Sequence, residues 1–184
     1  LTLTDGTYDI GGIAGQLNTL NLNGPAIVGT ATNLASGIYS NLGFGTTSNA
    51  NAGLFIPSSI TNLNALSMGI ALTNSVALNS NITLNSAGAA ALTLTQGRLA
   101  LGANNLTVLS ELTTGISAPG SATSFILADG TGQLIRAIPG NISSASIYLF
   151  PVGDATATAD YSPVSLNFSA TSALPVNRQI GVRV

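Results

Sequence analysis

The side chains that could carry acid, base or metal chemistry are few in this chain of 184 residues. It contains no His, no Cys and no Lys, so a Ser-His-Asp or Cys-His arrangement is impossible and a zinc site is not expected. The sequence does not bring an acid and a base together, and we predict no enzymatic activity, no cofactor and no metal site. The charged residues are Asp5, Asp9, Arg98, Glu111, Asp129, Arg136, Asp154, Asp160, Arg178 and Arg183.

Four of the acidic residues fall in or beside turns. Asp5 and Asp129 each precede Gly, and we interpret them as turn residues because Asp hydrogen-bonds its own backbone at turns. Asp154 and Asp160 flank a loop rich in Thr and Ala and could bind a hard cation through their oxygen atoms. A calcium loop normally supplies more carboxylates at closer spacing, so a plain solvated loop is the favoured interpretation.

The composition points away from several classes of protein. Charged residues make up 5% of the chain, against about 25% in soluble domains, and the formal net charge is -2. So little charge leaves copies of the chain weakly protected against self-association. The mean hydropathy is +0.46, but no apolar run approaches the ~20 residues of a spanning helix. Four Arg residues cannot form a stripe that binds nucleic acid, so we expect neither membrane insertion nor a nucleic-acid partner.

The elements that would position any site are short strands, and they are clearest between Val76 and Val108. This stretch contains five pulses in which two apolar residues flank a single residue, so that both apolar side chains point to the same side of an extended chain. The first members of the pulses lie 6, 10, 7 and 7 residues apart, which is too short for ordinary hairpins and predicts a solenoid. The pulses are Val76/Leu78, Ile82/Leu84, Leu92/Leu94, Leu99/Leu101 and Leu106/Val108.

Three pulses per turn give coils of about 20 to 24 residues, a plausible length for a three-sided parallel β-helix, which we predict over residues 1–114. Leu, Ile and Val would point inward, Thr and Asn outward, and the small residues Ala87–Ala91 would form a tight corner. Asn recurs at the ends of pulses, and we expect these side chains to stack between successive turns, although unconnected polar turns are the alternative. The Asn residues concerned are Asn79, Asn81, Asn85, Asn104 and Asn105.

The same rhythm extends toward the N-terminus. Leu1–Thr4 and Thr7–Ile10 are predicted as short strands, and Thr46–Gly53 as an extended loop for which disorder is the alternative. The apolar residues from Ile60 to Leu72 recur at spacings of three, three, four and two, which a helical turn could also produce. We favour strands there because the intervening Asn, Ser and Gly residues are poor helix formers.

The pattern changes after Leu112, and for residues 115–184 we predict an antiparallel sheet or a small sandwich that packs on the solenoid or follows it. Phe125–Leu127 and Leu134–Ile138 are expected to pair as a hairpin across a turn at Asp129-Gly130. The predicted fold class is therefore all-β, a parallel β-helix or solenoid followed by a small antiparallel region. Further strands are predicted at Ile147–Val152, Pro163–Phe168 and Gln179–Val184.

Six segments, taken in order, carry a resemblance. They are LTLTDGTYDIGG, LNTLNLNG, SSITNLNALSM, the stretch from Val76 to Val108, YLFPVGD and YSPVSLNF, and they span most of residues 1–168. Together they resemble the long secreted β-helical surface proteins, adhesin-like or stalk-like, of Bacteroidetes-type bacteria. The resemblance implies export and roles in adhesion, surface coats or stalks. Such proteins commonly carry a C-terminal sorting domain, and none follows Val184, so we expect a fragment, a processed form or a departure from the family pattern.

We expect a non-catalytic extracellular structural module at the bacterial cell surface. It would bind copies of itself in a fibre or surface layer, or neighbouring modules of a surface protein. A solenoid presents unpaired backbone donors and acceptors at its ends, and this chain has few charges to blunt them. Strand addition at these ends is the predicted mechanism. The candidate edge residues are Leu1, Thr2, Leu3, Thr4, Gly181, Val182, Arg183 and Val184.

Two other binding functions stay open as alternatives. An adhesive or glycan-binding module would need an exposed aromatic cluster. An ice-binding face would need Thr-x-Thr pairs on many consecutive coils, and the pairs at Thr2/Thr4 and Thr93/Thr95 are more simply outward Thr residues on strands. The remaining alternative is a polysaccharide lyase or hydrolase, which would need acidic and basic side chains on one outer face. The aromatic candidates for a glycan site are Tyr39, Phe44, Tyr148 and Tyr161.

Overall fold

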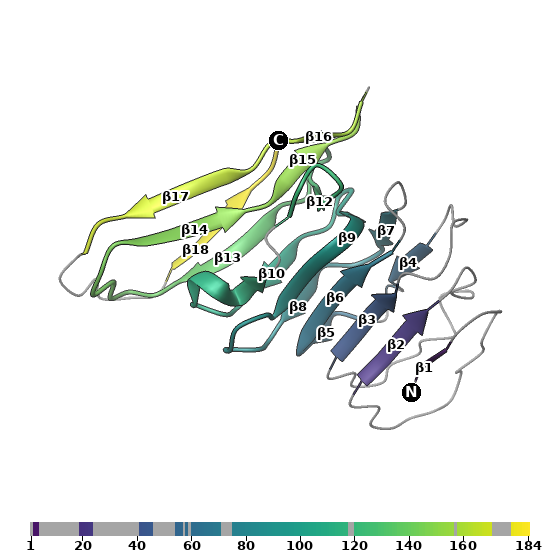
Figure 1. The fold of residues 1–184 in the computed structure, drawn as a ribbon, viewed down its shortest axis with the longest axis horizontal. Helices are drawn as coiled ribbons and strands as arrows, with labels where there is room; N and C mark the ends of the chain where they lie inside the picture. The colour runs from purple at the N-terminus through teal and green to yellow at the C-terminus, as the bar shows by residue number, and fades with distance from the viewer. Residues whose placement is uncertain are drawn as a thin grey trace.

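The computed structural model is built almost entirely of β-strands in the residues that it describes. Within them the one helical element is the three-residue 3-10 turn η1 (Thr113–Gly115). The strands lie side by side along the length of the molecule, from β1 at one end to β17 at the other (Figure 1). The described residues are 2–3, 19–23, 41–45, 54–56, 58, 60–70, 75–117, 120–156, 158–170 and 178–184.

The coils have three faces, and on each face strands from successive coils pair in parallel. The first face contains β1 (Thr2–Leu3), β2 (Thr19–Asn23), β3 (Asn41–Gly45), β6 (Ala65–Gly69), the first half of β9 (Leu92–Ala100) and β11 (Ile116–Ser117). The second face contains β4 (Leu54–Ile56), β7 (Ser75–Leu78), the second half of β9, β12 (Ser124–Leu127) and β15 (Val152–Asp154). The third face contains β5 (Asn62–Leu63), β8 (Ile82–Leu84), β10 (Leu106–Val108) and β13 (Leu134–Ile138).

The five pulses predicted between Val76 and Val108 are confirmed as the core of this β-solenoid. Each of their ten apolar side chains is at most 4% exposed. In chain order the pulses fall on the second, third, first, second and third faces, which confirms three pulses per coil. The side chains stack in columns because the ladder places equivalent residues of successive coils opposite one another. Leu66, Leu92 and Ile116 form one such column on the first face.

The length of a coil varies more than predicted. Residues paired between successive coils lie from 19 positions apart, as Thr2 and Asn21 do, to 28 positions apart, as Leu106 and Leu134 do. Ile60, Leu63, Leu66 and Ile70 are all buried and belong to β5, β6 and their flanks, so the preference for strands over a helical turn is confirmed. Gly97 has a φ of 78°, which lets β9 turn from the first face to the second.

The corners of the coils also stack, and three of the five Asn side chains bond to the backbone of a neighbouring coil, so the polar turns are connected as predicted. Asn104 does so by donating from Nδ2 to the carbonyl of Leu78 at 2.7 Å. The Oδ1 atom of Asn81 accepts a hydrogen bond from the backbone N–H of Asn105 at 2.8 Å. One coil further on, Oδ1 of Asn105 accepts from the N–H of Gln133 at 2.9 Å. The stack therefore runs from side-chain oxygen to backbone N–H, and not between side-chain amides. Such bonds satisfy corner N–H groups that have left the strand ladders.

The small residues Ala87–Ala91 form a corner between β8 and β9, as predicted. The chain turns at Ala89 and Ala90, and Ala90 adopts a left-handed φ of 58°. The hydroxyl of Ser110, from the next coil, donates a hydrogen bond to the carbonyl of Gly88 at 2.7 Å. The next coil thus holds this corner in place through a buried polar contact.

The predicted hairpin between Phe125–Leu127 and Leu134–Ile138 is wrong. These segments form β12 and β13, which do not pair with each other. β12 pairs in parallel with β9 and β15 on the second face, and β13 pairs in parallel with β10 on the third. The turn at Asp129-Gly130 is the corner between two faces. The solenoid therefore continues past residue 114, although whether the ranges 1–114 and 115–184 fold as separate units stays a prediction.

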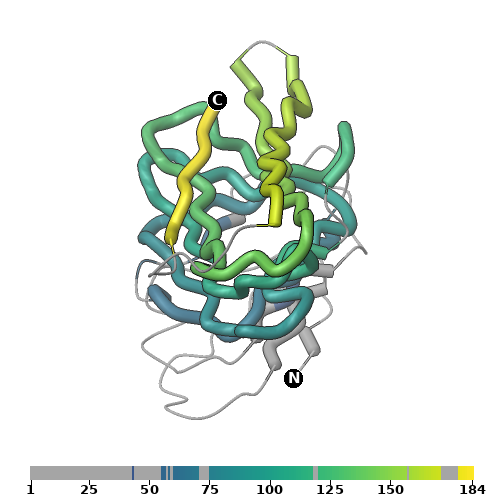
Figure 2. The backbone as a smooth tube through the Cα atoms, turned by 90° about the vertical axis from the view of Figure 1, so that its left-hand side faces the viewer, coloured from purple at the N-terminus to yellow at the C-terminus, as the bar shows by residue number. Residues whose placement is uncertain are grey.

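Antiparallel pairing enters at the C-terminal end, as predicted. β14 (Ser146–Phe150) pairs with β17 (Val164–Phe168), β15 with β16 (Asp160–Tyr161), and β13 with β18 (Arg178–Val182). Viewed from this end, the β14–β17 ribbon and the yellow β18 lie at different sides of the stacked coils (Figure 2). The predicted strand Ile147–Val152 is divided at Pro151 between β14 and β15. The predictions for Thr7–Ile10 and Thr46–Gly53 lie outside the described residues.

We expect the replacement Leu99→Ala to lower the free energy of unfolding by about 3 kcal/mol, because Leu99 is fully buried in a central coil and its loss would leave a cavity. Leu112→Ala is the matched control, since Leu112 is 47% exposed, and its effect should stay below about 0.5 kcal/mol. Urea unfolding followed by circular dichroism measures both. Equal losses in the two variants would contradict the assignment of Leu99 to the core.

Candidate functional site at the solenoid ends

The strands that contain the predicted edge residues lie at the ends of their sheets. β1 is the terminal strand beyond β2 on the first face, and β18 is the terminal strand beyond β13 on the third face. Of the predicted residues Leu1–Thr4, the middle two form β1, and the outer two lie outside the described residues. Within the described part of the chain, each of these strands therefore pairs along one edge and leaves its other edge without a partner strand.

The four predicted C-terminal residues are placed in and just after β18. Gly181 and Val182 belong to the strand and lie opposite β13 in the antiparallel ladder. Arg183 follows the strand and is exposed. The backbone N–H of Val184 donates to the carbonyl of Ala128 at 3.1 Å, which ties this end of the chain to the corner after β12. The role of these residues in association stays a prediction.

A further strand edge lies outside the predicted set. β17 pairs with β14 alone, so its outer edge has no partner strand among the described residues. Val164, Leu166 and Phe168 are half-buried against the core, while Ser165 and Asn167 point outward and are exposed. β17 contains no charged residue. The alternation in VSLNF correctly predicts a strand, but nothing in it distinguishes an edge strand from an inner one.

The residue that closes the solenoid was not assigned a role from the sequence. Arg136 follows Val108 and Leu84 in an inward column of the third face, and it is fully buried. Its position could have been found from the sequence, because it is the third residue of LIRAI and shares the inward phase of Leu134 and Ile138. An Arg at such a position needs a special environment, since a buried charge is costly unless its donors are satisfied.

The guanidinium of Arg136 bridges two parts of the chain that do not pair as strands. Nη2 donates to the carbonyl of Leu112 at 2.8 Å and to that of Thr113 at 3.2 Å, next to η1. Nη1 donates to the carbonyl of Leu149 in β14 at 2.8 Å. β14 lies where the first face would continue but pairs with β17 instead of β11. Arg136 thus supplies hydrogen bonds at the place where the parallel ladder of the first face ends.

Two aromatic rings cover the guanidinium of Arg136. Its Cζ lies 5.2 Å from the ring centre of Tyr148 and 5.9 Å from that of Phe150. Burial lowers the pKa of Arg136 to about 10, an effect that the nearby Tyr148 hydroxyl partly offsets. The group therefore stays charged at neutral pH. Contacts between a cation and the faces of aromatic rings offset part of the desolvation cost.

Tyr148 joins this cluster to the neighbouring loop. Its hydroxyl donates to the carbonyl of Glu111 at 2.8 Å, and its ring meets the ring of Phe168 edge to face at 5.7 Å. Burial raises the pKa of Tyr148, while the charge of Arg136 acts in the opposite direction and that of Glu111 in the same direction. The ring is 3% exposed, so it holds the β14–β17 ribbon against the last coil and does not offer a free stacking face.

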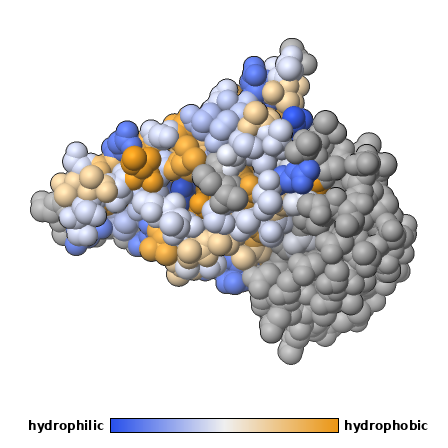
Figure 3. All heavy atoms as spheres, viewed as in Figure 1, coloured by the Kyte–Doolittle hydropathy of each residue, from blue (hydrophilic) through white to orange (hydrophobic). Residues whose placement is uncertain are grey.

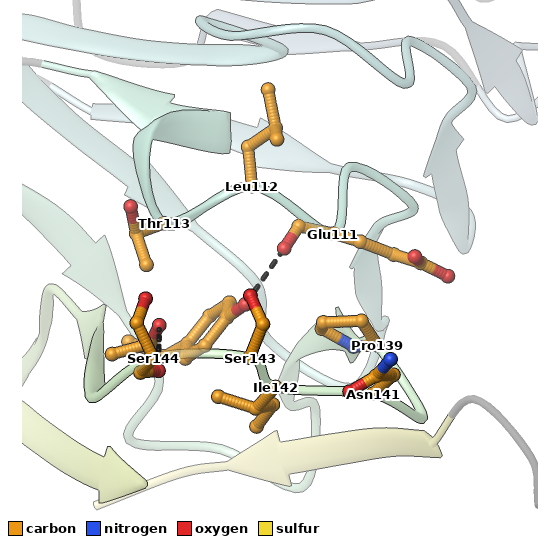
Figure 4. Close-up of a pocket in the computed structure, with 10 residues that line it drawn as sticks. Glu111, Leu112, Thr113, Pro139, Asn141, Ile142, Ser143 and Ser144 are labelled. Carbon is orange, nitrogen blue, oxygen red and sulfur yellow. Dashed lines mark hydrogen bonds between the residues drawn. The ribbon is translucent and has the colours of Figure 1, made fainter. Parts of the chain in front are cut away.

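A polar cavity of about 250 Å³ opens beside Tyr148. Its walls are Glu111, Leu112 and Thr113 on one side and the loop of residues 139–146 on the other (Figure 4). Serine hydroxyls and the amide of Asn141 give it hydrogen-bonding capacity. The cavity contains one residue that is charged, Glu111, and no base, so its lining does not form an acid-base pair.

The acidic turn that could have held a cation is arranged as an ordinary loop. Asp154 and Asp160 lie directly opposite each other at the end of the β15–β16 pair. Oδ1 of Asp154 accepts hydrogen bonds from the backbone N–H and the hydroxyl of Thr156, at 3.3 and 3.1 Å. Asp129 accepts from the N–H of Ala155 at 3.2 Å. In the described ranges no three His, Cys, Asp or Glu residues come close enough to hold a metal ion.

The aromatic candidates for a glycan site do not come together in the described part of the structure. Tyr148 is buried, and Tyr161 is half-buried with its ring centre 5.8 Å from that of Phe125. Tyr39 lies outside the described residues, and Phe44 belongs to β3, where the backbone alone is described. The hypothesis of an exposed aromatic cluster thus receives no support from Tyr148.

Comparison with known proteins does not assign this chain to a family. No protein-family model matches the sequence, and neither curated proteins nor solved structures give a significant match. The resemblance to secreted bacterial surface proteins therefore stays a prediction. Among the described residues, no helix has the length and apolar character needed to cross a membrane. What the structure establishes is the class, an all-β parallel solenoid with an antiparallel C-terminal region.

We expect Arg136→Met to lower the free energy of unfolding by about 3 kcal/mol, because the carbonyl groups of Thr113 and Leu149 would lose this donor and each unsatisfied buried group costs ~1–3 kcal/mol. The carbonyl of Leu112 would keep its hydrogen bond from the N–H of Gly115. Arg98→Met is the matched control. Arg98 stacks on Phe125 but is partly exposed, and its loss should cost no more than about 1 kcal/mol. Urea unfolding at pH 7 measures both, and an Arg136→Met variant as stable as the parent would contradict the bridging role.

We expect the ionisation of Tyr148 to lower the stability of the folded state as the pH rises above 10. The folded state keeps Tyr148 neutral because burial raises its pKa, whereas the unfolded chain ionises this group near its ordinary value of 10.0. Tyr148→Phe removes this titration, so its free energy of unfolding should fall less steeply from pH 9.5 to 11.5. Arg136 acts in the opposite direction, because a pKa lowered to about 10 in the folded state makes the protein more stable as the pH rises. The measured quantity is therefore the difference in slope between the two proteins. Equal slopes in urea unfolding would contradict the burial of the phenol.

Proposed function

We propose that this chain is a non-catalytic, extracellular structural module that associates with copies of itself into a fibre or surface layer. The observation that carries the proposal is that terminal strands at both ends of the stack have one edge without a partner strand among the described residues, including β1 at one end and β17 and β18 at the other. Such edges carry a row of free N–H and C=O groups and are templates for pairing with another chain. In this proposal β1 of one copy adds to an open edge of the next copy.

The closed core at the C-terminal end favours association through edges. The β14–β17 ribbon packs the partly buried Val164, Leu166 and Phe168 against the core of the last coil. A second copy therefore cannot continue the solenoid there by stacking apolar side chains on an open core. Backbone groups along the terminal strands are what this end offers to a partner.

The surface offers little electrostatic resistance to such contacts. The whole chain has four Arg and six acidic residues. On the described part of the face shown in Figure 3, strongly hydrophilic residues are scattered among pale polar and apolar ones. Charge repulsion between copies is therefore weak, and unlike many monomeric proteins the chain has few charged side chains with which to blunt its edges.

The extracellular setting and the lack of catalysis are part of the proposal. The absence of His and Cys removes the common nucleophile-base pairs, and the described cavity beside Tyr148 contains an acid without a base. The order of segments that resembles secreted surface proteins supports export. In that setting the partner could equally be a neighbouring module of a longer surface protein, joined through the same edges.

The test is a charge placed on the edge of β1. We expect Thr2→Lys to raise the apparent dissociation constant of self-association about fivefold, equivalent to ~1 kcal/mol, because Lys hinders pairing at an edge. Thr95→Lys is the control, since Thr95 is exposed on β9, which has strands on both sides. Sedimentation velocity measures association, and electron microscopy shows its form. Discrete unassociated particles at every concentration of the parent chain would rule out the proposal.

A further inference from the structure

We propose that the edge which receives β1 of the next copy is β17, and not the C-terminal strand β18. This inference rests on the proposed self-association and identifies its acceptor. It follows from which face each strand occupies, from the direction in which each strand runs, and from where the exposed charges lie.

β17 continues the same face to which β1 belongs. From β3 onward a strand of the first face leads directly into a strand of the second face, as β6 precedes β7 and β11 precedes β12. β14 leads into β15 across Pro151 in the same way, so β14 occupies the first-face position of the last coil. β17 pairs with β14 and lies beyond it at the end of the molecule (Figure 1). The first face of a copy added at β17 would therefore lie in line with the first face of its neighbour.

The direction of β17 suits this arrangement. It runs antiparallel to β14, so a β1 strand that pairs antiparallel with β17 would run in the same direction as β14. Antiparallel pairs are slightly more stable per residue than parallel pairs. β18 lies on the third face, so addition of β1 there would require the next copy to be rotated by one face.

The charges favour β17 as well. β18 begins with the exposed Arg178 and is followed by the exposed Arg183, and charged side chains are a common means of protecting an edge from pairing. β17 has the sequence VSLNF and contains no charge. Beside it, Ile147 of β14 is 61% exposed and faces Asn167 across the ribbon. A groove of about 380 Å³ between these residues has uncharged walls.

The register shows which positions would meet. Thr2 pairs with Asn21, and the same column continues through Gly43, Ser67 and Thr93. Ser67 is exposed and Thr93 is partly exposed, so position 2 shares a register column with outward-facing residues of β6 and β9. Ser165 and Asn167 are on the outer side of β17. Position 2 of one copy would then lie near position 165 or 167 of the next.

Disulfide cross-linking tests the proposal directly because the chain contains no Cys. Thr2→Cys is mixed with Ser165→Cys or Asn167→Cys under oxidising conditions, at a concentration at which the parent associates. We expect a disulfide-linked heterodimer on a non-reducing gel that reducing agent removes. Two positions on β17 are used because a disulfide forms only when the Cα atoms are about 4.4–6.8 Å apart.

Two matched mixtures complete the experiment. Thr2→Cys with Gln179→Cys reports addition to β18, because Gln179 is exposed in that strand. Thr2→Cys with Thr95→Cys reports random collision at an exposed position within the stack. Each mixture is compared at the same concentration and oxidation time. We expect the yield of disulfide-linked heterodimer from the β17 mixtures to exceed the yield from each of these two mixtures at least severalfold.

The outcomes separate this inference from the proposed function. Cross-linking to Gln179 above that to β17 would overturn the inference and leave self-association standing, with β18 as acceptor. Association without cross-linking at either strand would also overturn it. If the parent chain does not associate at any concentration, both proposals fail. A Ser165→Lys variant gives a second readout, since it should weaken association about fivefold while Gln179→Lys should not.

Discussion

The stacking of inward apolar side chains, coil upon coil and in register, is the constraint on which the rest of this structure depends. A strand of two to five residues buries almost nothing by itself, so each coil is stable only because its neighbours cover it. Leu66, Leu92 and Ile116 show the principle on one face, where each side chain covers the next in a buried column. A stack of this kind has no natural end, and the structure departs from regularity where it stops.

Arg136 shows how one end is closed. The same inward column contains Leu84, Val108 and then Arg136. Within the stack the strand ladders satisfy the backbone, and an apolar side chain suffices. Beyond β11 the ladder of the first face ends, leaving carbonyl groups near η1 and in β14 without strand partners, and a guanidinium with five donors can reach both sides. The change from apolar side chains to Arg in one column thus marks the change from repeating coil to cap.

The alternation of inward and outward residues made the coils predictable from the sequence. The pairing of strands that lie far apart in the sequence was not predictable in this way. Local sequence determines the pulses, the corner at Ala87–Ala91 and the contacts of Asn81 and Asn105. Alternation along a strand predicts which side chains face inward. The mistaken hairpin arose because two apolar strands joined through Asp129-Gly130 are the pattern of both a hairpin and a solenoid corner. What separates the two is whether the strands pair with each other or with strands of other coils, and no local pattern contains that information.

The sequence by itself determined that this protein is an all-β solenoid with three faces, that it lacks His and Cys, and that it carries little charge. Tertiary structure alone decided how the stack ends. It placed Arg136 inside the last coil, turned β14 away from β11 to pair with β17, and set β18 against β13 on another face. The physical reason is that the spacing of apolar residues is a property of each strand alone. The end of the stack depends instead on which strands find no further partner, and that is decided by pairing between segments far apart in the sequence.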